Sequence, residues 1–201
     1  MERALAFFGA FNPPTVAHLS LAEFALRQTG RERVVFVPSQ SAYIRDDQGK
    51  DFAYDNAKRF SMLQAAAECR PWMRVTDWEL RQEKQPRTYE TLLHLREEGI
   101  QAALLLGSDK LPELEHGWQH VNGIAWEFGI VCLARGDDAC RELLRDDPYL
   151  SSLAPYIQIL DTPQTTRHVS STAVRQRVAK LREIEEELSG LVPREILPLL
   201  K

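Results

Sequence analysis

The sequence lacks any long apolar segment and any feature of a secretion signal. No apolar run in its 201 residues approaches the roughly 20 residues that cross a bilayer. The N-terminus shows no basic stretch that leads into an apolar one with a cleavage site. We therefore expect an unprocessed cytoplasmic protein with no membrane partner.

Cysteine and positive charge are also scarce. The three cysteines, Cys69, Cys132 and Cys140, show no metal or redox spacing, which is typical of incidental thiols in a reducing compartment. The formal net charge is −4, whereas proteins that hold nucleic acid by bulk electrostatics are basic. We expect no nucleic-acid partner and no metal held by protein ligands, but a single nucleotide needs only a local basic pocket.

What the sequence does contain is an alternation of short apolar runs with segments of helical period. Helices are predicted to end at Gly30, to begin at Asp55, and to run from Thr88 to Gly99. Such an alternation predicts an α/β domain with a parallel sheet covered on both faces and ligands at the carboxyl ends of the strands. The predicted strands are Leu5–Phe8, Val34–Val37, Met73–Val75, Ala102–Leu106, Ile130–Leu133 and Ile157–Leu160.

Two segments are less regular. Residues 38–54 form a polar stretch that we interpret as a long loop and a substrate lid, because loops of this length in compact domains are usually functional or disordered. The tail predicts a solvated helix over 182–188 and a short helix over 193–200. With no convincing linker, residues 1–201 are expected to form one domain whose residues 169–201 carry a C-terminal motif and helices.

The most informative segment runs from Gly9 to His18, between the first predicted strand and the first predicted helix. A strand–loop–helix junction directs free backbone N–H groups and the positive end of a helix dipole into one space, which suits polyphosphate. Thr15 and His18 are three residues apart at the helix start, so both face the same side and can reach one phosphate. A lone histidine at this position is more often a capping or packing residue, but the surrounding pattern favours a functional one.

A second segment, Val169–Arg175, enters another predicted helix. Three hydroxyl side chains, Ser170, Ser171 and Thr172, stand at its N-terminus, and Arg175 follows one turn later. The simple interpretation is a serine N-cap before an ordinary helix. The alternative is a cradle for the β- and γ-phosphates of a nucleotide.

These two segments resemble the signatures of the nucleotidyltransferase superfamily. Gly9–His18 is similar to Gly-x-Phe-x-Pro-x-(His or Thr)-x-x-His, and 169–175 is similar to Ile-Ser-Ser-Thr-x-x-Arg. Nearly the whole chain resembles the nicotinate or nicotinamide mononucleotide adenylyltransferases. The resemblance implies a Rossmann-like, doubly wound parallel sheet with a small C-terminal helical part.

The resemblance also implies further site residues. Gly107 and Asp109 match a Gly-x-Asp element that contacts nucleosides, and Arg135 matches an arginine that contacts the nucleotide, although a surface arginine is an equal alternative. A core position is the plain alternative for Trp118, and a helix cap for Thr88. On the mononucleotide side the matching residues are Asn12, Arg45, Thr88 and Trp118.

The implied reaction joins a pyridine mononucleotide to the adenylyl group of ATP and releases pyrophosphate, with Mg²⁺ bound to ATP. His18 would stabilise charge on the α-phosphate, Thr15 and the backbone of Gly9, Ala10 and Phe11 would hold that phosphate, and the 170–175 hydroxyls and guanidinium would bind pyrophosphate. Two alternatives stay open: a cytidylyltransferase or pantetheine-phosphate adenylyltransferase, and a non-catalytic nucleotide sensor. The state of assembly, including a homo-oligomer, is left open as well.

Overall fold

The computed structural model describes residues 1–46, 52–134, 139–163, 171–172, 174–175 and 190–200. Its centre is a six-stranded, fully parallel sheet in the order β3-β2-β1-β4-β5-β6. The strands are β1 (Glu2–Gly9), β2 (Arg33–Pro38), β3 (Met73–Val75), β4 (Ile100–Gly107), β5 (Ile130–Ala134) and β6 (Ile157–Asp161). All six predicted strands are confirmed, and this order is that of a doubly wound sheet whose direction of winding reverses between β1 and β4.

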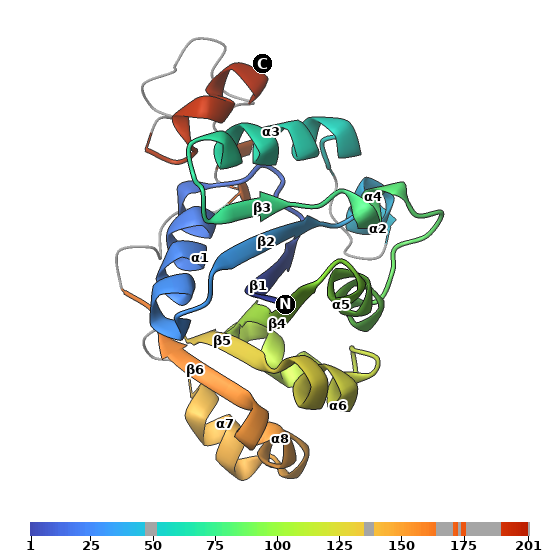
Figure 1. Cartoon of the computed structure of the whole chain (residues 1–201), viewed down its shortest axis with the longest axis vertical. Coiled ribbons are helices and arrows are strands. Elements are labelled where there is room, and N and C mark those ends of the chain that lie inside the picture. Colours follow the sequence, from blue (N-terminus) through green and yellow to red (C-terminus); the bar gives the residue numbers. More distant parts are fainter. Residues whose placement is uncertain (47–51, 135–138, 164–170, 173, 176–189, 201) are drawn as a thin grey trace.

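Helices cover both faces of this sheet, as Figure 1 shows for α1 on one side and α5 and α6 on the other. The α-helices are α1 (Val16–Thr29), α2 (Ser41–Asp46), α3 (Asn56–Glu68), α4 (Trp78–Arg81), α5 (Thr88–Glu97), α6 (Val121–Gly123), α7 (Cys140–Asp146) and α8 (Pro148–Leu153). Shorter turns are the 3₁₀ segments η1 (Ser108–Glu113), η3 (Ala154–Tyr156) and η5 (Arg194–Leu200), and the π-helical η2 (Ile124–Phe128). Among the described residues, none of the helices combines the length and apolarity that a bilayer crossing requires.

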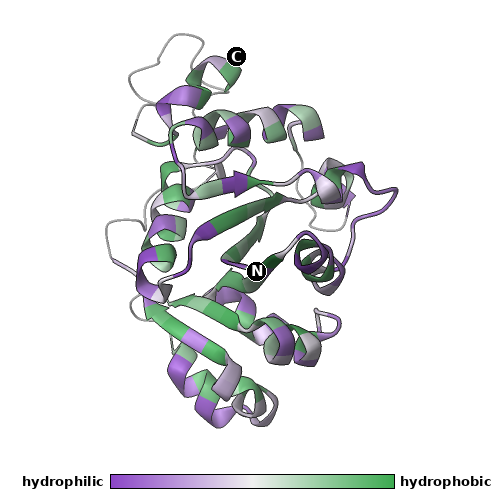
Figure 2. Cartoon of the chain, in the orientation of Figure 1, coloured by the Kyte–Doolittle hydropathy of each residue, from purple (hydrophilic) through white to green (hydrophobic). Residues whose placement is uncertain are grey.

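The core is split by the sheet into two apolar layers. Side chains alternate along β1, so that Ala4 and Ala6 pack toward α5 while Leu5 packs toward α1 and α3. Burial on both faces explains why the strands are continuous apolar runs rather than alternating ones. Figure 2 shows the same pattern, with hydrophobic strands at the centre and hydrophilic outer faces on the helices.

The predicted helix ends are confirmed at their caps. Gly30 follows α1 in the left-handed conformation, with φ of 60°, and its N–H donates to the Leu26 carbonyl. Asp55 caps α3 by accepting the Lys58 N–H at 2.7 Å. The third helix ends two residues before Gly99, which has φ of 85°.

The interpretation of residues 38–54 as one long loop is wrong in part. Ser41–Asp46 forms α2, in which the Ser41 N–H and hydroxyl both donate to the Asn56 side chain at 2.8 Å. Ile44 is fully buried beneath this helix. A single buried apolar residue gives no periodicity, so the helix left no pattern in the sequence.

The tail prediction is confirmed only for its last part. The 3₁₀ turn η5 lies beside α3 (Figure 1), with Ile196 and Leu200 buried in the layer that α1 and α3 share. The helix expected over 182–188 lies outside the described residues.

Burial of α3 should make a strong contribution to stability. Leu63 is fully buried, whereas its neighbour Gln64 is exposed. We expect Leu63→Ala to lower the free energy of unfolding by about 2–5 kcal/mol and Gln64→Ala to change it by less than about 0.5 kcal/mol. Urea unfolding followed by circular dichroism measures both, and equal effects would contradict the assigned face of α3.

Candidate active site

The loop that follows β1 is shaped by one aromatic ring. The Phe11 ring is buried and packs against His18 with a centroid distance of 5.2 Å and against Phe7 at 5.5 Å. A Cβ at Gly9 would lie 3.1 Å from the Phe11 Cζ, and Phe11 itself has φ of 42°. The glycine therefore gives the ring its space, and the ring fixes the course of the loop.

Thr15 and His18 form a reciprocal cap at the start of α1. The Thr15 N–H donates to His18 Nδ1 at 3.0 Å, and the Thr15 hydroxyl lies 2.9 Å from the same atom. In return, the His18 N–H donates to the Thr15 hydroxyl at 3.4 Å. Because Nδ1 accepts a backbone N–H, the neutral imidazole carries its proton on Nε2.

The position of Thr15 differs from the one that the sequence predicts. The sequence predicts that Thr15 and His18 contact the same phosphate, but Thr15 is fully buried and its hydroxyl is hydrogen-bonded within the cap. His18 lines the large cleft of the molecule. His18 therefore lines the cleft, whereas Thr15 orients its imidazole from within the protein.

Asn12, which the sequence assigns to the mononucleotide, is likewise occupied inside the protein. It is 1% exposed, its amide donates to the Phe52 carbonyl at 2.8 Å, and its side-chain oxygen accepts the Tyr54 N–H at 2.9 Å. Both ends of the amide are satisfied by backbone. The residue therefore fastens the chain at residues 52–54 to the loop after β1.

The C-terminal motif docks directly on this loop, 158 or more residues away in sequence. The Ser171 hydroxyl donates to the Pro13 carbonyl at 2.7 Å, and Arg175 Nη1 donates to the Asn12 carbonyl at 2.6 Å. Arg175 Nη2 also donates to the Thr172 hydroxyl at 3.2 Å. The structure brings the two predicted phosphate motifs together; Ser170 lies outside the described residues.

A cleft of about 1050 Å³ opens at the carboxyl ends of the strands. Its floor contains the ends of β1 and β4, where the winding of the sheet reverses and ligands of doubly wound folds bind. Of the predicted site residues, those that line it are Gly9, Ala10, Phe11, His18, Thr88, Gly107, Asp109, Trp118 and Ser171.

Several predicted contacts are absent from this lining: among the described residues these are Arg45, Thr172 and Arg175, besides Asn12 and Thr15. Arg45 is exposed on α2, and the residue of that helix that lines the cleft is Tyr43. Arg135 lies outside the described residues. Thr88 is the first residue of α5 rather than its cap, since the N-cap is Arg87.

Arg59 of α3 is a structural residue that the sequence analysis did not single out. Its guanidinium is fully buried and donates to three backbone carbonyls, those of Ala10 at 2.7 Å, Ser39 at 2.5 Å and Tyr54 at 3.1 Å. Burial lowers the pKa of Arg59 to about 10, which the nearby Asp55 opposes. Arg59 remains charged at neutral pH and holds the loop after β1 against the end of β2.

A buried carboxylate, Glu79 of α4, also lines the cleft. It is 1% exposed and accepts the Thr91 hydroxyl at 2.6 Å and the Gln85 amide at 2.5 Å. Burial raises the pKa of Glu79 to about 7, and the two hydrogen bonds oppose that rise. Motif comparison matched the pair Glu79–Leu80 to a family element but assigned no role to Glu79 itself.

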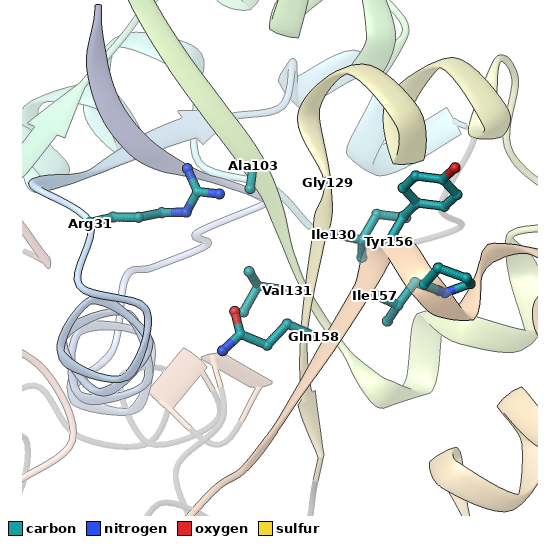
Figure 3. A pocket seen from close by; sticks show the side chains of 9 residues that line it. Arg31, Ala103, Gly129, Ile130, Val131, Tyr156, Ile157 and Gln158 are labelled. Carbon is teal, nitrogen blue, oxygen red and sulfur yellow. The ribbon is translucent and has the colours of Figure 1, made fainter.

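A smaller recess of about 210 Å³ lies near the amino-terminal ends of β5 and β6, away from the motifs (Figure 3). Figure 3 shows Arg31 and Gln158 on one side of β5 and Tyr156 on the other. None of the predicted site residues lines it. The predicted site residues that line a cavity, Ser171 of the C-terminal motif among them, line the large cleft instead.

Comparison with known proteins agrees with this geometry. A family model described as cytidylyltransferase-like matches residues 6–177. A probable nicotinate-nucleotide adenylyltransferase of Clostridium botulinum (strain Eklund 17B / Type B) is 26% identical over 201 residues, which cover 100% of this chain and 96% of the relative. Nicotinamide/nicotinic acid mononucleotide adenylyltransferase 2 of Caenorhabditis elegans is 26% identical, with 90% of this chain and 89% of the relative covered.

A solved structure has the same fold. Plasmodium falciparum nicotinic acid mononucleotide adenylyltransferase complexed with NaAD superimposes with a TM-score of 0.74 at 15% identity, covering 100% of this chain and 95% of that one. The Rossmann-like prediction for the sheet is thereby confirmed.

The raised pKa of Glu79 predicts a pH-dependent loss of stability. Unfolding returns its pKa from about 7 to near 4.5, so the stability that the native carboxyl contributes is lost as the pH rises through about 7. We expect the isosteric Glu79→Gln to be as stable as wild type near the unfolded pKa and more stable at pH 8, by at most about 3 kcal/mol.

Urea unfolding across this pH range measures the difference. A matched control is Glu113→Gln, since Glu113 lines the same cleft but is half exposed and paired with Lys110 at 2.7 Å. It should follow wild type throughout. A difference between Glu79→Gln and wild type that does not change with pH would contradict the prediction.

Proposed function

Because the chain belongs to the cytidylyltransferase-like family, we propose that it is an adenylyltransferase that joins nicotinate or nicotinamide mononucleotide to the adenylyl group of ATP and releases pyrophosphate. The observation that carries this proposal is the docking of Ser171 and Arg175 on the loop that also holds His18. The names of the bacterial and nematode relatives, both pyridine-nucleotide adenylyltransferases, support the choice of substrates.

The reaction requires alignment and charge stabilisation rather than an activated nucleophile. An oxygen of the mononucleotide phosphate, already ionised near neutral pH, attacks the α-phosphorus of ATP, and the bond to the bridging β-oxygen breaks as pyrophosphate leaves. No general base is needed. This accounts for a site built from N–H, hydroxyl and guanidinium donors.

His18 is the residue that we assign to the α-phosphate. The cap with Thr15 sets the tautomer with the proton on Nε2, and charge builds up on the α-phosphate oxygens in the transition state, where such an N–H donor stabilises it. Thr15 acts through His18 as a positioning residue. The backbone of Gly9, Ala10 and Phe11, which lines the cleft beside His18, holds the same phosphate.

Pyrophosphate is assigned to the C-terminal motif, with Ser170, Ser171, Thr172 and Arg175. Arg175 uses two of its five N–H donors on Asn12 and Thr172. A guanidinium anchored in this way retains donors for phosphate oxygens without losing further rotamer freedom.

The two substrates divide the cleft at the reversal point of the sheet. Leu133 and Thr162 line it on the β5 and β6 side together with Ser171, and we assign this side to ATP, with Arg135 and the Gly107–Asp109 turn. On the β2 side the lining comes from Ser39, Tyr43 and residues 85–88, and we assign this side to the mononucleotide, with Thr88 and Trp118 as its contacts. Asn12 and Arg45 do not line the cleft, and we assign both to the same side: Asn12 holds residues 52–54 beside it, and Arg45 lies on α2.

Magnesium is proposed to arrive with ATP. In the described ranges, no three or more His, Cys, Asp or Glu side chains gather where they could hold a metal ion. Mg²⁺ keeps several waters and prefers phosphate oxygens as ligands. A cleft whose side chains mainly donate hydrogen bonds to phosphate therefore fits a cation that is bound by the nucleotide rather than by the protein. It would neutralise charge on the phosphate oxygens.

The test is release of pyrophosphate by the purified protein. It is incubated with ATP and Mg²⁺ plus nicotinate mononucleotide, nicotinamide mononucleotide or phosphopantetheine, and separately with CTP and a phosphorylated alcohol. We expect pyrophosphate with at least one pyridine mononucleotide. Release only with phosphopantetheine or CTP would replace the proposal with the corresponding transferase, and ATP binding without release from any pair would indicate a sensor.

Loss of the His18 donor should slow turnover with little effect on binding. We expect His18→Ala to lower kcat by about 10²–10³, the cost of removing one donor from a developing oxyanion, with KM for ATP changed much less. His18→Gln, which places an amide N–H near the former Nε2, should recover part of the rate. The control His116→Ala alters an exposed histidine and should match wild type; an unchanged kcat in His18→Ala would remove His18 from the mechanism.

A further inference from the structure

Glu79 lies in the wall of the cleft, yet the transfer reaction described above makes no use of it. It is a carboxylate with 1% exposure in a site that binds two anionic substrates. Burying a charge is costly unless it is paired or hydrogen-bonded. The hydrogen bonds of Glu79 run in two directions.

The first connection runs through Gln85. Its amide N–H donates to one Glu79 oxygen at 2.5 Å, and its amide oxygen accepts the Gln40 N–H at 2.7 Å. Gln40 in turn donates to the Glu79 carbonyl at 2.9 Å and to the Gln82 carbonyl at 2.7 Å. Gln85 is therefore fixed between the chain that follows β2 and the carboxylate of α4.

The second connection runs through Thr91 to the start of α5. The Thr91 hydroxyl donates to the other Glu79 oxygen at 2.6 Å and lies 3.5 Å from the Arg87 carbonyl. One partner of Glu79 is the first residue of the segment Gln85–Thr88, whose four residues line the cleft, and the other lies three residues after that segment. The carboxylate therefore connects the start of this wall to the first turn of α5.

The two protonation states of Glu79 are not equivalent in this network. The ionised form accepts from Thr91 and Gln85. When Glu79 is protonated, the Gln85 amide can still only donate, so the proton must sit on the oxygen that faces Thr91. The Thr91 hydroxyl then accepts that proton's hydrogen bond and turns its own O–H toward the Arg87 carbonyl.

We propose that Glu79 is a positioning residue for the acceptor mononucleotide: it holds the wall Gln85–Thr88, and its carboxylate takes up a proton when the anionic mononucleotide binds beside that wall. The inference rests on the proposed function, which places the mononucleotide on the β2 side of the cleft. Removing the negative charge of Glu79 relieves repulsion with the phosphate, while the hydrogen bonds to Gln85 and Thr91 survive protonation.

Two cations on the elements around Glu79 are paired with carboxylates, whereas Arg87 belongs to the wall itself. Arg81 pairs with Asp77 on α4 and Lys110 pairs with Glu113 in η1. The pKa of Glu79, raised by burial to about 7, places the proton uptake in the neutral range. The other titratable groups on the elements around it are Tyr43 of α2, Glu83 and Lys84 after α4, Arg87 and Glu90 at the start of α5, and His18 and Asp109 across the cleft.

The experiment compares KM for mononucleotide and for ATP between pH 6 and 8.5 in wild type, Glu79→Gln and Glu79→Ala. The mononucleotide phosphate titrates in the same range, so the decisive quantity is the ratio of wild-type KM to Glu79→Gln KM. We expect this ratio for mononucleotide to rise at least about threefold from pH 6 to pH 8. The corresponding ratio for ATP should stay within twofold.

The other variants separate positioning from general damage to the fold. Glu79→Ala releases Gln85 and Thr91, and it should raise the mononucleotide KM about tenfold or more at every pH, with a smaller change for ATP. Glu79→Gln keeps both hydrogen bonds and should restore the low-pH KM of wild type. The control Glu113→Gln removes a carboxylate from the same cleft and should leave the pH dependence intact.

Calorimetry of mononucleotide binding near pH 7, in buffers of different ionisation enthalpy, provides a readout that needs no turnover. Wild type should take up more protons on binding than Glu79→Gln, by about half a proton. Equal uptake, or a KM ratio that does not change with pH, overturns the inference. Binding without turnover refutes the proposed reaction but not the role of Glu79, and absence of mononucleotide binding refutes both.

Discussion

The arrangement of the active cleft depends on one buried guanidinium. Arg59 leaves α3 and donates to the backbone carbonyls of Ala10, Ser39 and Tyr54, which belong to three separate connections. The Phe11 ring packs the loop after β1 against the core, and the guanidinium ties that loop to the other two connections. A charge that is desolvated and hydrogen-bonded on several sides gives that region a single geometry, because any displacement would leave the guanidinium unsatisfied.

The remaining contacts build outward from this point. Asn12 attaches residues 52–54 to the same loop, and its carbonyl and that of Pro13 then receive Arg175 and Ser171 from the C-terminal motif. Backbone carbonyls, rather than carboxylates, are the acceptors at each step. The positive charge of Arg175 is therefore not cancelled where the proposed reaction needs it for phosphate.

The sequence predicted the sheet well because each strand is buried on both faces and reads as a separate apolar run. Gly30 and Asp55 marked helix ends through local chemistry that does not depend on the rest of the fold. The α2 helix was missed because only Ile44 faces the core with an apolar side chain. A helix can be predicted from apolar periodicity only when several of its residues follow that periodicity.

The site was predicted less completely, and for a different reason. Motif spelling located His18 and Arg175, but it could not distinguish a polar group that meets a ligand from one that is satisfied by the protein, as with Asn12 and Thr15. The same reasoning assigned no role to Arg59 or Glu79, since a charged residue on a helix is ordinarily solvated. Their roles follow from partners that lie 5 to 49 residues away in the sequence.

The cap formed by Thr15 and His18 has a further consequence. Four consecutive residues define which ring nitrogen carries the proton, and they need only the first turn of α1 to be wound. The tautomer of the imidazole is thus determined by local secondary structure. The same four residues, placed at another strand–loop–helix junction, would therefore carry the proton on the same ring nitrogen.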